Sequence, residues 1–264
     1  MEGVINGEKT FCEWLLYIIQ NYGIWFLKGT GITLLIAITG TAIGFLIGIC
    51  LGSVKTIPLP HNEVKRVLMK IVNAIIACYV EIFRGTPMMV QAIVMYFGMQ
   101  EFVGINFSPT IAGIVIVSIN TGAYMVEVVR GGIESVDPGQ MEAARSIGMT
   151  HVQAMMSIIL PQNIKNILPA TGNEFIINIK DTSVLNVISV TELFFVTKSI
   201  KGAIFRTYET FLISAAIYFI LTLAVTRILK YFEKRMDRPR EFIHASSTMP
   251  ILFVKKPGDK NNGK

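Results

Sequence analysis

Charged residues are scarce in this sequence of 264 amino acids. They make up 16% of the chain, whereas a water-soluble domain usually carries about 25%. Two stretches, 29–54 and 102–126, contain no charged residue and no histidine. Each is longer than the roughly 20 residues that cross a bilayer core as a helix. This scarcity excludes an ordinary soluble domain and predicts an integral membrane protein.

Motifs that carry chemistry are scarce as well. The three cysteines, Cys12, Cys50 and Cys78, are odd in number and lack metal-ligand spacing, which argues against a disulfide framework and against a metal site. The three histidines are scattered along the chain. A GxxxxGK[ST] phosphate loop is absent, so we expect a chain that is not an ATPase, not another enzyme, and that binds no cofactor itself.

The beginning of the sequence lacks the basic region and the short apolar core of a cleavable signal peptide, so the first long apolar run is expected to act as an uncleaved insertion signal. The net charge is +6, and basic residues outnumber acidic ones after Phe232. A basic flank that follows an apolar segment is typical of the cytoplasmic side of a membrane. We therefore expect membrane lipid, and not nucleic acid, as its partner.

The apolar stretches predict an all-α integral membrane fold with about five transmembrane helices. An interfacial helix over 11–27 leads into the first span, with a separate span there as the alternative. The five expected spans are 29–54, 72–99, 109–130, a broken span at 160–180 that is followed by a short embedded stretch, and 210–232.

This pattern divides the chain into an extracytoplasmic or interfacial segment (1–28), a transmembrane domain (29–235) and a basic cytoplasmic tail (236–264). An odd number of spans places the termini on opposite sides of the membrane. The basic loop 55–70 and the basic tail favour a C-terminus inside and an N-terminus outside. The basic residues of 197–209 run against this orientation, because they would face outside.

Small residues form a stripe in the first expected span. Gly40, Gly44, Gly48 and Gly52 recur every four residues, so they share one helix face and allow another helix to approach closely. That helix belongs either to the same chain or to a second copy, and the spacing favours neither.

The polar segment 135–162 predicts a short helix at the cytoplasmic surface. Asp137 can cap a helix whose first residue is a proline. Gly148 suits the left-handed residue just after a helix end, and Thr150 with Gln153 offers a second capping box. A short helix across the cytoplasmic face is suited to fill a groove on another protein.

Several motifs resemble those of a known family. Glu142-Ala143-Ala144, Gly148 and Ile159-Leu160-Pro161 follow the order and spacing of the EAA loop of ABC importer permeases. Other segments are similar to signatures of the polar amino-acid subfamily, which includes histidine, glutamine and arginine permeases. They are EIFRGTP (81–87) with Gln91, AYMVEVVRGGI (123–133) and KDTSVL (180–185). The resemblance covers about 29–235.

The resemblance implies a type I ABC importer transmembrane domain, the permease subunit of an ATP-driven importer for polar or charged amino acids in the bacterial cytoplasmic membrane. It implies that the loop 137–161 couples the chain to a separate ABC ATPase subunit, which binds the ATP. It also implies an extracytoplasmic amino-acid-binding protein and a second permease chain, identical or related. The residues that the resemblance assigns to ATPase coupling are Glu142, Ala143, Ala144, Arg145 and Gly148.

Polar residues at membrane depth are candidates for the substrate path, because such groups are costly in lipid. Two sets share a helix face by their i, i+4, i+7 spacing: Asn120, Tyr124 and Glu127, and Glu174, Asn178 and Asp181. An amino acid needs acceptors for its ammonium group and donors for its carboxylate. The substrate-binding candidates are Glu81, Arg84, Thr86, Gln91, Asn120, Tyr124, Asp181 and Ser183. The alternative is that the Glu81–Arg84 and Glu127–Arg130 pairs only neutralise one another and fix helix packing.

Two other functions stay open from the sequence. An ion-driven secondary amino-acid transporter would also carry buried charges and a broken helix, although it would not need a cytoplasmic docking loop. A structural partner in a heterodimeric permease, which binds no substrate itself, is the other.

Overall fold

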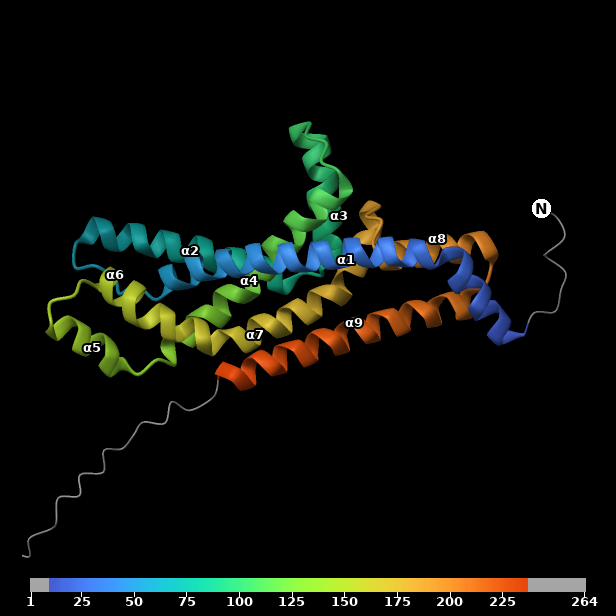
Figure 1. Ribbon diagram of the computed structural model, residues 1–264. Coiled ribbons are helices and arrows are strands. Elements are labelled where there is room, and N and C mark those ends of the chain that lie inside the picture. Colours follow the sequence, from blue (N-terminus) through green and yellow to red (C-terminus); the bar gives the residue numbers. More distant parts are fainter. Residues whose placement is uncertain (1–9, 237–264) are drawn as a thin grey trace, which may run out of the picture.

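The structure, a computed structural model, describes residues 10–236, and every regular element in that range is helical (Figure 1). The helices are α1 (Phe11–Lys55), α2 (Glu63–Gly85), α3 (Met88–Gly98), α4 (Pro109–Glu134), α5 (Pro138–Ser146), α6 (His151–Ala154), α7 (Leu160–Asp181), α8 (Leu193–Ile204) and α9 (Thr207–Met236). The predicted all-α fold is confirmed. Of the expected basic tail, residues 237–264 lie outside the described range.

Helix α1 joins the expected interfacial helix and the first span into one helix of 45 residues. Its start is fixed by a reciprocal cap, in which the Thr10 hydroxyl accepts from the Glu13 backbone N–H and the Thr10 N–H donates to the Glu13 carboxylate. At 1.5 Å per residue such a helix is about 68 Å long, which exceeds the roughly 30 Å of a bilayer core. Figure 1 shows its first turns bent away from the rest.

The glycine stripe forms a close seam between α1 and α4. Gly40, Gly44, Gly48 and Gly52 are all buried, and a Cβ atom at any of them would lie less than 3.0 Å from an atom of α4. The closest approach is at Gly48, whose added Cβ would overlap Met125. The stripe is therefore a packing seam within one chain, which the spacing alone left undecided.

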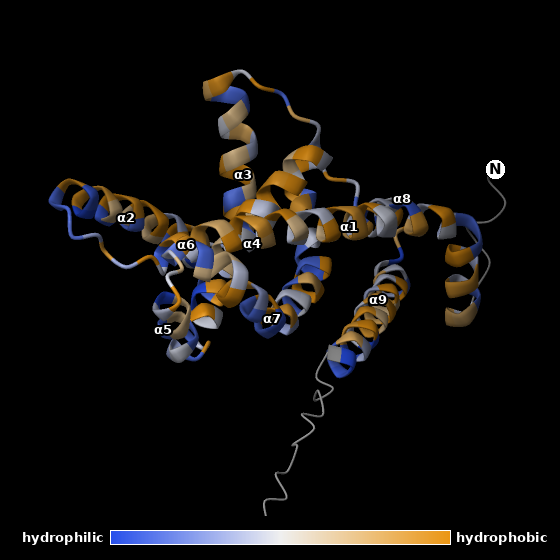
Figure 2. Cartoon of the chain, turned by 60° about the vertical axis from the view of Figure 1, so that its left-hand side comes forward, coloured by the Kyte–Doolittle hydropathy of each residue, from blue (hydrophilic) through white to orange (hydrophobic). Residues whose placement is uncertain are grey.

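The prediction of one continuous span over 72–99 is wrong, because the helix is broken in the middle of this range. Helix α2 ends at Gly85, Thr86 is extended with ψ of 149°, and α3 begins after Pro87. Proline disfavours helical geometry in the residue before it and has no N–H for the helix ladder. In Figures 1 and 2, α3 projects sideways from the bundle of long helices.

The prediction of a break within 160–180 is also wrong, because the helix is continuous there and the chain bends only after residue 188. A continuous helical stretch runs from His151 to Ile188 and includes Pro169. It contains a π-helical turn (Met155–Ile159) before α7 and a 3-10 helix (Thr182–Ile188) after it. Pro161 lies just after the π-helical turn, so the regular hydrogen-bond ladder of the α-helix is already interrupted where its N–H is missing. The chain turns only after Ser189, which has φ of +64°, and α8 is bent by 55° from the preceding helix.

Three of the described helices are long and apolar enough to cross a membrane, namely α1, α4 and α9, and the bent pair 151–188 with 193–204 makes a fourth. The spans expected at 109–130 and 210–232 correspond to α4 and α9. In Figure 2, most of α1 and α9 has the colour of hydrophobic residues. In Figure 1, α5 lies at one end of the bundle, while α8 and the start of α1 lie at the other.

Candidate functional site

A polar cavity of about 290 Å³ lies where the broken α2–α3 path meets α4 and α7. It is lined by Thr86, Pro87, Met88, Asn120, Tyr124, Glu174, Ile177, Asn178 and Asp181. Four of the predicted substrate residues are therefore brought together, namely Thr86, Asn120, Tyr124 and Asp181. All three residues of the predicted set on α7, Glu174, Asn178 and Asp181, also line the cavity.

Asn178 fixes the helices that surround this cavity. Its side chain is 3% exposed, and its amide group donates to the hydroxyl of Thr41 at 2.8 Å and to that of Thr121 at 2.9 Å. These bonds join α7 to α1 and to α4. Because buried polar groups are costly without partners, the three helices are held in one arrangement at this depth.

Gln91 supports the break between α2 and α3 and does not line the cavity. Its side chain is 6% exposed, and its amide nitrogen lies 2.9 Å from the carbonyl oxygens of both Phe83 and Thr86. Its amide oxygen accepts from Asn120 at 2.8 Å. The side chain thus satisfies carbonyls that the end of α2 leaves without helical partners.

Three further candidates fall outside the cavity lining. The Arg84 guanidinium lies over the ring of Tyr124, 5.4 Å from its centre, so it borders the cavity through that ring. Glu81 is exposed, and among the ion pairs of residues 10–236 none joins it to Arg84, so the predicted pair is wrong. Ser183 is half-buried in the 3-10 helix after α7.

Two carboxylates, from Glu174 and Asp181, face the same cavity. The Thr86 hydroxyl and the Asn120 amide nitrogen donate to other groups of the protein. Carboxylates accept hydrogen bonds and attract cations, and the hydroxyl of Tyr124, which also lines the cavity, can donate. The cavity can therefore meet both charged groups of an amino acid. Glu174 was not among the substrate-binding candidates, although its spacing of seven from Asp181 was the signal for it.

Helix α5 is defined at both ends by its own sequence. The Asp137 carboxylate accepts from the backbone N–H of Gly139 at 2.8 Å. At the other end the N–H of Gly148 donates to the Arg145 carbonyl, and that of Met149 donates to the Ala144 carbonyl. With Gly148 at φ of +84°, this is a Schellman ending. The capping box of Thr150 and Gln153 is also confirmed.

The outer face of α5 is open to its surroundings. Glu142, Ala143 and Arg145 are exposed, while Ala144 is buried against the protein. Ile147 is 78% exposed, which is unusual for an isoleucine beside a polar loop. It was missed from the sequence, where the only signal was an apolar residue next to the glycine that ends the helix.

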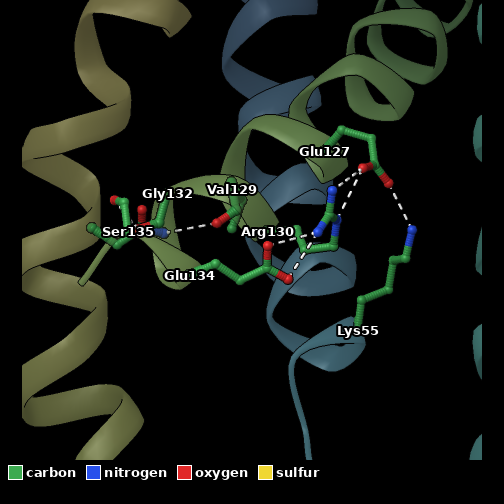
Figure 3. A network of polar contacts seen from close by, with 8 residues as sticks. Lys55, Glu127, Val129, Arg130, Gly132, Glu134 and Ser135 are labelled. Carbon is green, nitrogen blue, oxygen red and sulfur yellow. Dashed lines mark hydrogen bonds and ion pairs between the residues drawn. The ribbon is translucent and has the colours of Figure 1, made fainter. Parts of the chain in front are cut away.

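An ion-pair network lies where α1 and α4 end (Figure 3). The Glu127 carboxylate binds Lys55 Nζ at 2.6 Å through one oxygen and the Arg130 guanidinium at 2.9 Å through the other. Arg130 also binds Glu134 at 2.8 Å. The predicted Glu127–Arg130 pair is confirmed, and it belongs to this network and not to the cavity. Within residues 10–236, no group of His, Cys, Asp and Glu is placed to hold a metal ion.

Comparison with known proteins gives a consistent result. Residues 48–238 match the family described as the binding-protein-dependent transport system inner membrane component. A putative glutamine transport system permease protein GlnP of Rickettsia typhi is 34% identical over 224 residues, which cover 84% of this chain and 98% of that protein. The glutamine transport system permease protein GlnP of Escherichia coli K12 is 34% identical over 211 residues, which cover 80% and 92%.

Two solved structures share the architecture. A chain of an amino acid ABC transporter with histidines superposes with a TM-score of 0.71 at 38% sequence identity, over 84% of this chain and 98% of that one. A chain of the inward-facing MetNI methionine ABC transporter superposes with a TM-score of 0.67 over 85% and 97%. At 20% identity, the second likeness concerns the fold alone.

Proposed function

This chain belongs to the family of binding-protein-dependent transport system inner membrane components, and we propose that it forms the membrane path of an ATP-driven importer for polar amino acids. The observation that carries the proposal is the cavity between α2, α4 and α7, with carboxylates and hydrogen-bond donors on its walls. Relatives named as glutamine permeases support an amino acid as the cargo.

The cavity residues divide into two groups, one for the ammonium group of the amino acid and one for its carboxylate. Glu174 and Asp181 accept from the substrate ammonium group, and the Tyr124 hydroxyl donates to its carboxylate. The backbone N–H groups near the break at Pro87 add further donors, as at other broken membrane helices. Gln91 positions Asn120 and the end of α2, while Glu81 and Ser183 have no direct part.

A cationic amino acid is the second candidate cargo. Two carboxylates line the cavity, and a neutral side chain such as that of glutamine needs only one of them for the ammonium group. The second is then available for a positively charged side chain. Competition between glutamine and arginine for the same uptake distinguishes the two cargoes.

The energy comes from a separate ATPase subunit, which binds α5. The sequence has no phosphate loop of its own, so it takes no ATP or other cofactor. The exposed face of α5 presents Glu142, Ala143, Arg145 and Ile147, and the Gly148 ending sets the angle of the chain that returns to the membrane. An extracytoplasmic binding protein delivers the amino acid, and a second permease chain completes the path.

The membrane orientation follows from charge. Lys55, Arg130 and Arg145 lie at the end of the bundle that carries α5, and basic residues mark the cytoplasmic side. We place α5 and the C-terminus inside and the N-terminus outside, in the bacterial cytoplasmic membrane, and the broken α2–α3 path then makes the fifth crossing. Lys198 and Lys201 of α8 then face outside, against the general rule.

Uptake by proteoliposomes tests the function. The vesicles contain this chain, its ATPase and ATP inside, and receive labelled glutamine or arginine with the binding protein outside. We expect uptake only when ATP is present. Uptake that an ion gradient alone sustains would contradict the importer and favour a secondary transporter.

A further inference from the structure

The ion pair between Lys55 and Glu127 differs from the others in the described part of the chain. The remaining pairs join residues three or four positions apart, so each stays within one helix or its first turn. Lys55–Glu127 joins residues 72 positions apart and connects two helices. Its Nζ–Oε1 distance of 2.6 Å is short, and the two side chains are only 20% and 23% exposed.

The position of this pair connects two parts of the proposed machine. Lys55 is the last residue of α1, and Glu127 lies in the C-terminal third of α4. Arg130 carries the network on to Glu134, the last residue of α4. Only three residues then separate α4 from the start of α5. The network therefore lies between the long α1–α4 seam and the helix that we assign to the ATPase.

The other side of α4 is held by close packing. A Cβ atom at Gly132 would overlap Asn163 and Ile167 of α7, and the Asn163 amide donates to the Val129 carbonyl at 3.3 Å. Figure 3 shows the α4 turn with Val129 and Gly132 between the network and the neighbouring helix. The end of α4 is thus fixed to α7 by shape and to α1 by charge.

The glycine seam holds α1 closely against α4 from Gly40 to Gly52, as small residues do between membrane helices. Lys55 lies three residues beyond the last of these glycines, at the end of α1. A charge-assisted hydrogen bond has a preferred length and direction, and partial burial protects it from screening by salt. The Lys55–Glu127 bond is such a directional contact, and it lies near the C-terminal ends of α1 and α4, close to α5.

We propose that Lys55 and Glu127 are positioning residues that make α1 move together with α4 when the ATPase displaces α5. This inference rests on the proposed function. Glu127 holds Lys55 with one oxygen while Arg130 holds the other, so the carboxylate joins the α1 end to a stiffened last part of α4. Without the bond, α4 moves with α5, the end of α1 beyond the seam lags behind, and ATP is hydrolysed without opening the path.

Replacement of Lys55 is the informative change. In Lys55→Gln the Glu127 carboxylate keeps Arg130 as its counter-charge, and Arg130 keeps Glu134. Only the link between the helices is lost. Lys55→Arg keeps the charge and the hydrogen bond, and Glu63→Gln removes an exposed pair with Arg66 within α2 as a matched control.

The experiment measures ATP hydrolysed per amino acid imported, in proteoliposomes that hold the complete importer. We expect Lys55→Gln to raise this ratio by about twofold to thirtyfold, which corresponds to the roughly 0.5–2 kcal/mol by which mutations in coupling networks change coupling. Lys55→Arg should restore it, and Glu63→Gln should not alter it. The melting temperature and the amount of ATPase co-purified with each variant are recorded alongside.

A ratio for Lys55→Gln equal to that of Glu63→Gln would overturn the inference. So would a loss of uptake matched by an equal loss of hydrolysis in a variant with normal melting temperature and normal ATPase content, because transport and hydrolysis would then stay coupled without the link. Failure of the proposed function itself is recognised separately, since the unmodified chain would then import without ATP.

Discussion

The two faces of α4 are built on opposite principles. Towards α1, the glycines of the seam bring two backbones together and exclude every side chain larger than hydrogen. Towards α2 and α7, Asn120 and Tyr124 border an open polar space. Contact between helices in lipid relies on close packing, so the seam can act as a fixed frame. Polar groups gather where the helix path is broken, and the cavity lies at that place.

The seam is the part where a single methyl group should have the largest effect. Gly48→Ala places a Cβ against Met125, and we expect a loss of about 2–3 kcal/mol in the free energy of unfolding, as for overpacked cores. Gly31→Ala is the control in the same helix, because nothing lies within 4 Å of its added Cβ. Alanine there should be neutral or stabilising by up to about 1 kcal/mol. Thermal unfolding of the purified variants measures both, and equal melting temperatures would show that the seam is not close-packed.

The cavity should respond in transport and not in stability. Asp181→Asn removes a charge that we assign to the substrate ammonium group. A hydrogen bond to a charged group contributes about 1.5–3 kcal/mol, so we expect uptake at low substrate concentration to fall about tenfold or more. Ser183→Ala lies two residues away and outside the cavity lining, and it should leave uptake unchanged. Equal uptake by the two variants would remove Asp181 from the path.

The α2–α3 break lies beside the polar cavity. A substitution there is expected to change the free energy of unfolding less than one in the glycine seam. Gln91→Leu leaves the carbonyls of Phe83 and Thr86 and the Asn120 amide without this partner. Unsatisfied buried groups cost about 1–3 kcal/mol, and we expect the lower part of that range because the break lies beside an open cavity. Met89→Leu, on the exposed side of the same helix, is the control. Unfolding in denaturant should separate the two, and identical stability would mean that Gln91 does not support the break.

Local rules predict the loop 137–153 around α5 well. The cap at Asp137, the left-handed glycine at 148 and the Thr150–Gln153 box each depend on residues within a few positions of one another, so the sequence contains the whole interaction. The periodicity on α7 also placed Asn178 and Asp181 on one face, and both line the cavity.

Contacts between distant segments were harder to predict. The glycine stripe gave the face of α1 but not its partner, because shape complementarity involves side chains 77 positions away, such as Met125 opposite Gly48. The sequence predicts Gln91 as a substrate residue because a polar group at membrane depth needs a partner. That partner is the broken end of α2, which a continuous span over 72–99 does not have. Lys55 is one of several basic residues of the loop 55–70 in the sequence, and its partner Glu127 lies 72 positions away.

In the proposed importer, α5 is the surface on which a separate ATPase acts. A photo-activated cross-linking residue in place of Ile147, which is 78% exposed, tests it directly in the assembled importer. A matched residue in place of Ile38, exposed on the membrane part of α1, is the control. The account predicts a covalent permease–ATPase product from position 147 and none from position 38. Position 147 giving no ATPase adduct, in an importer that still transports, would contradict it.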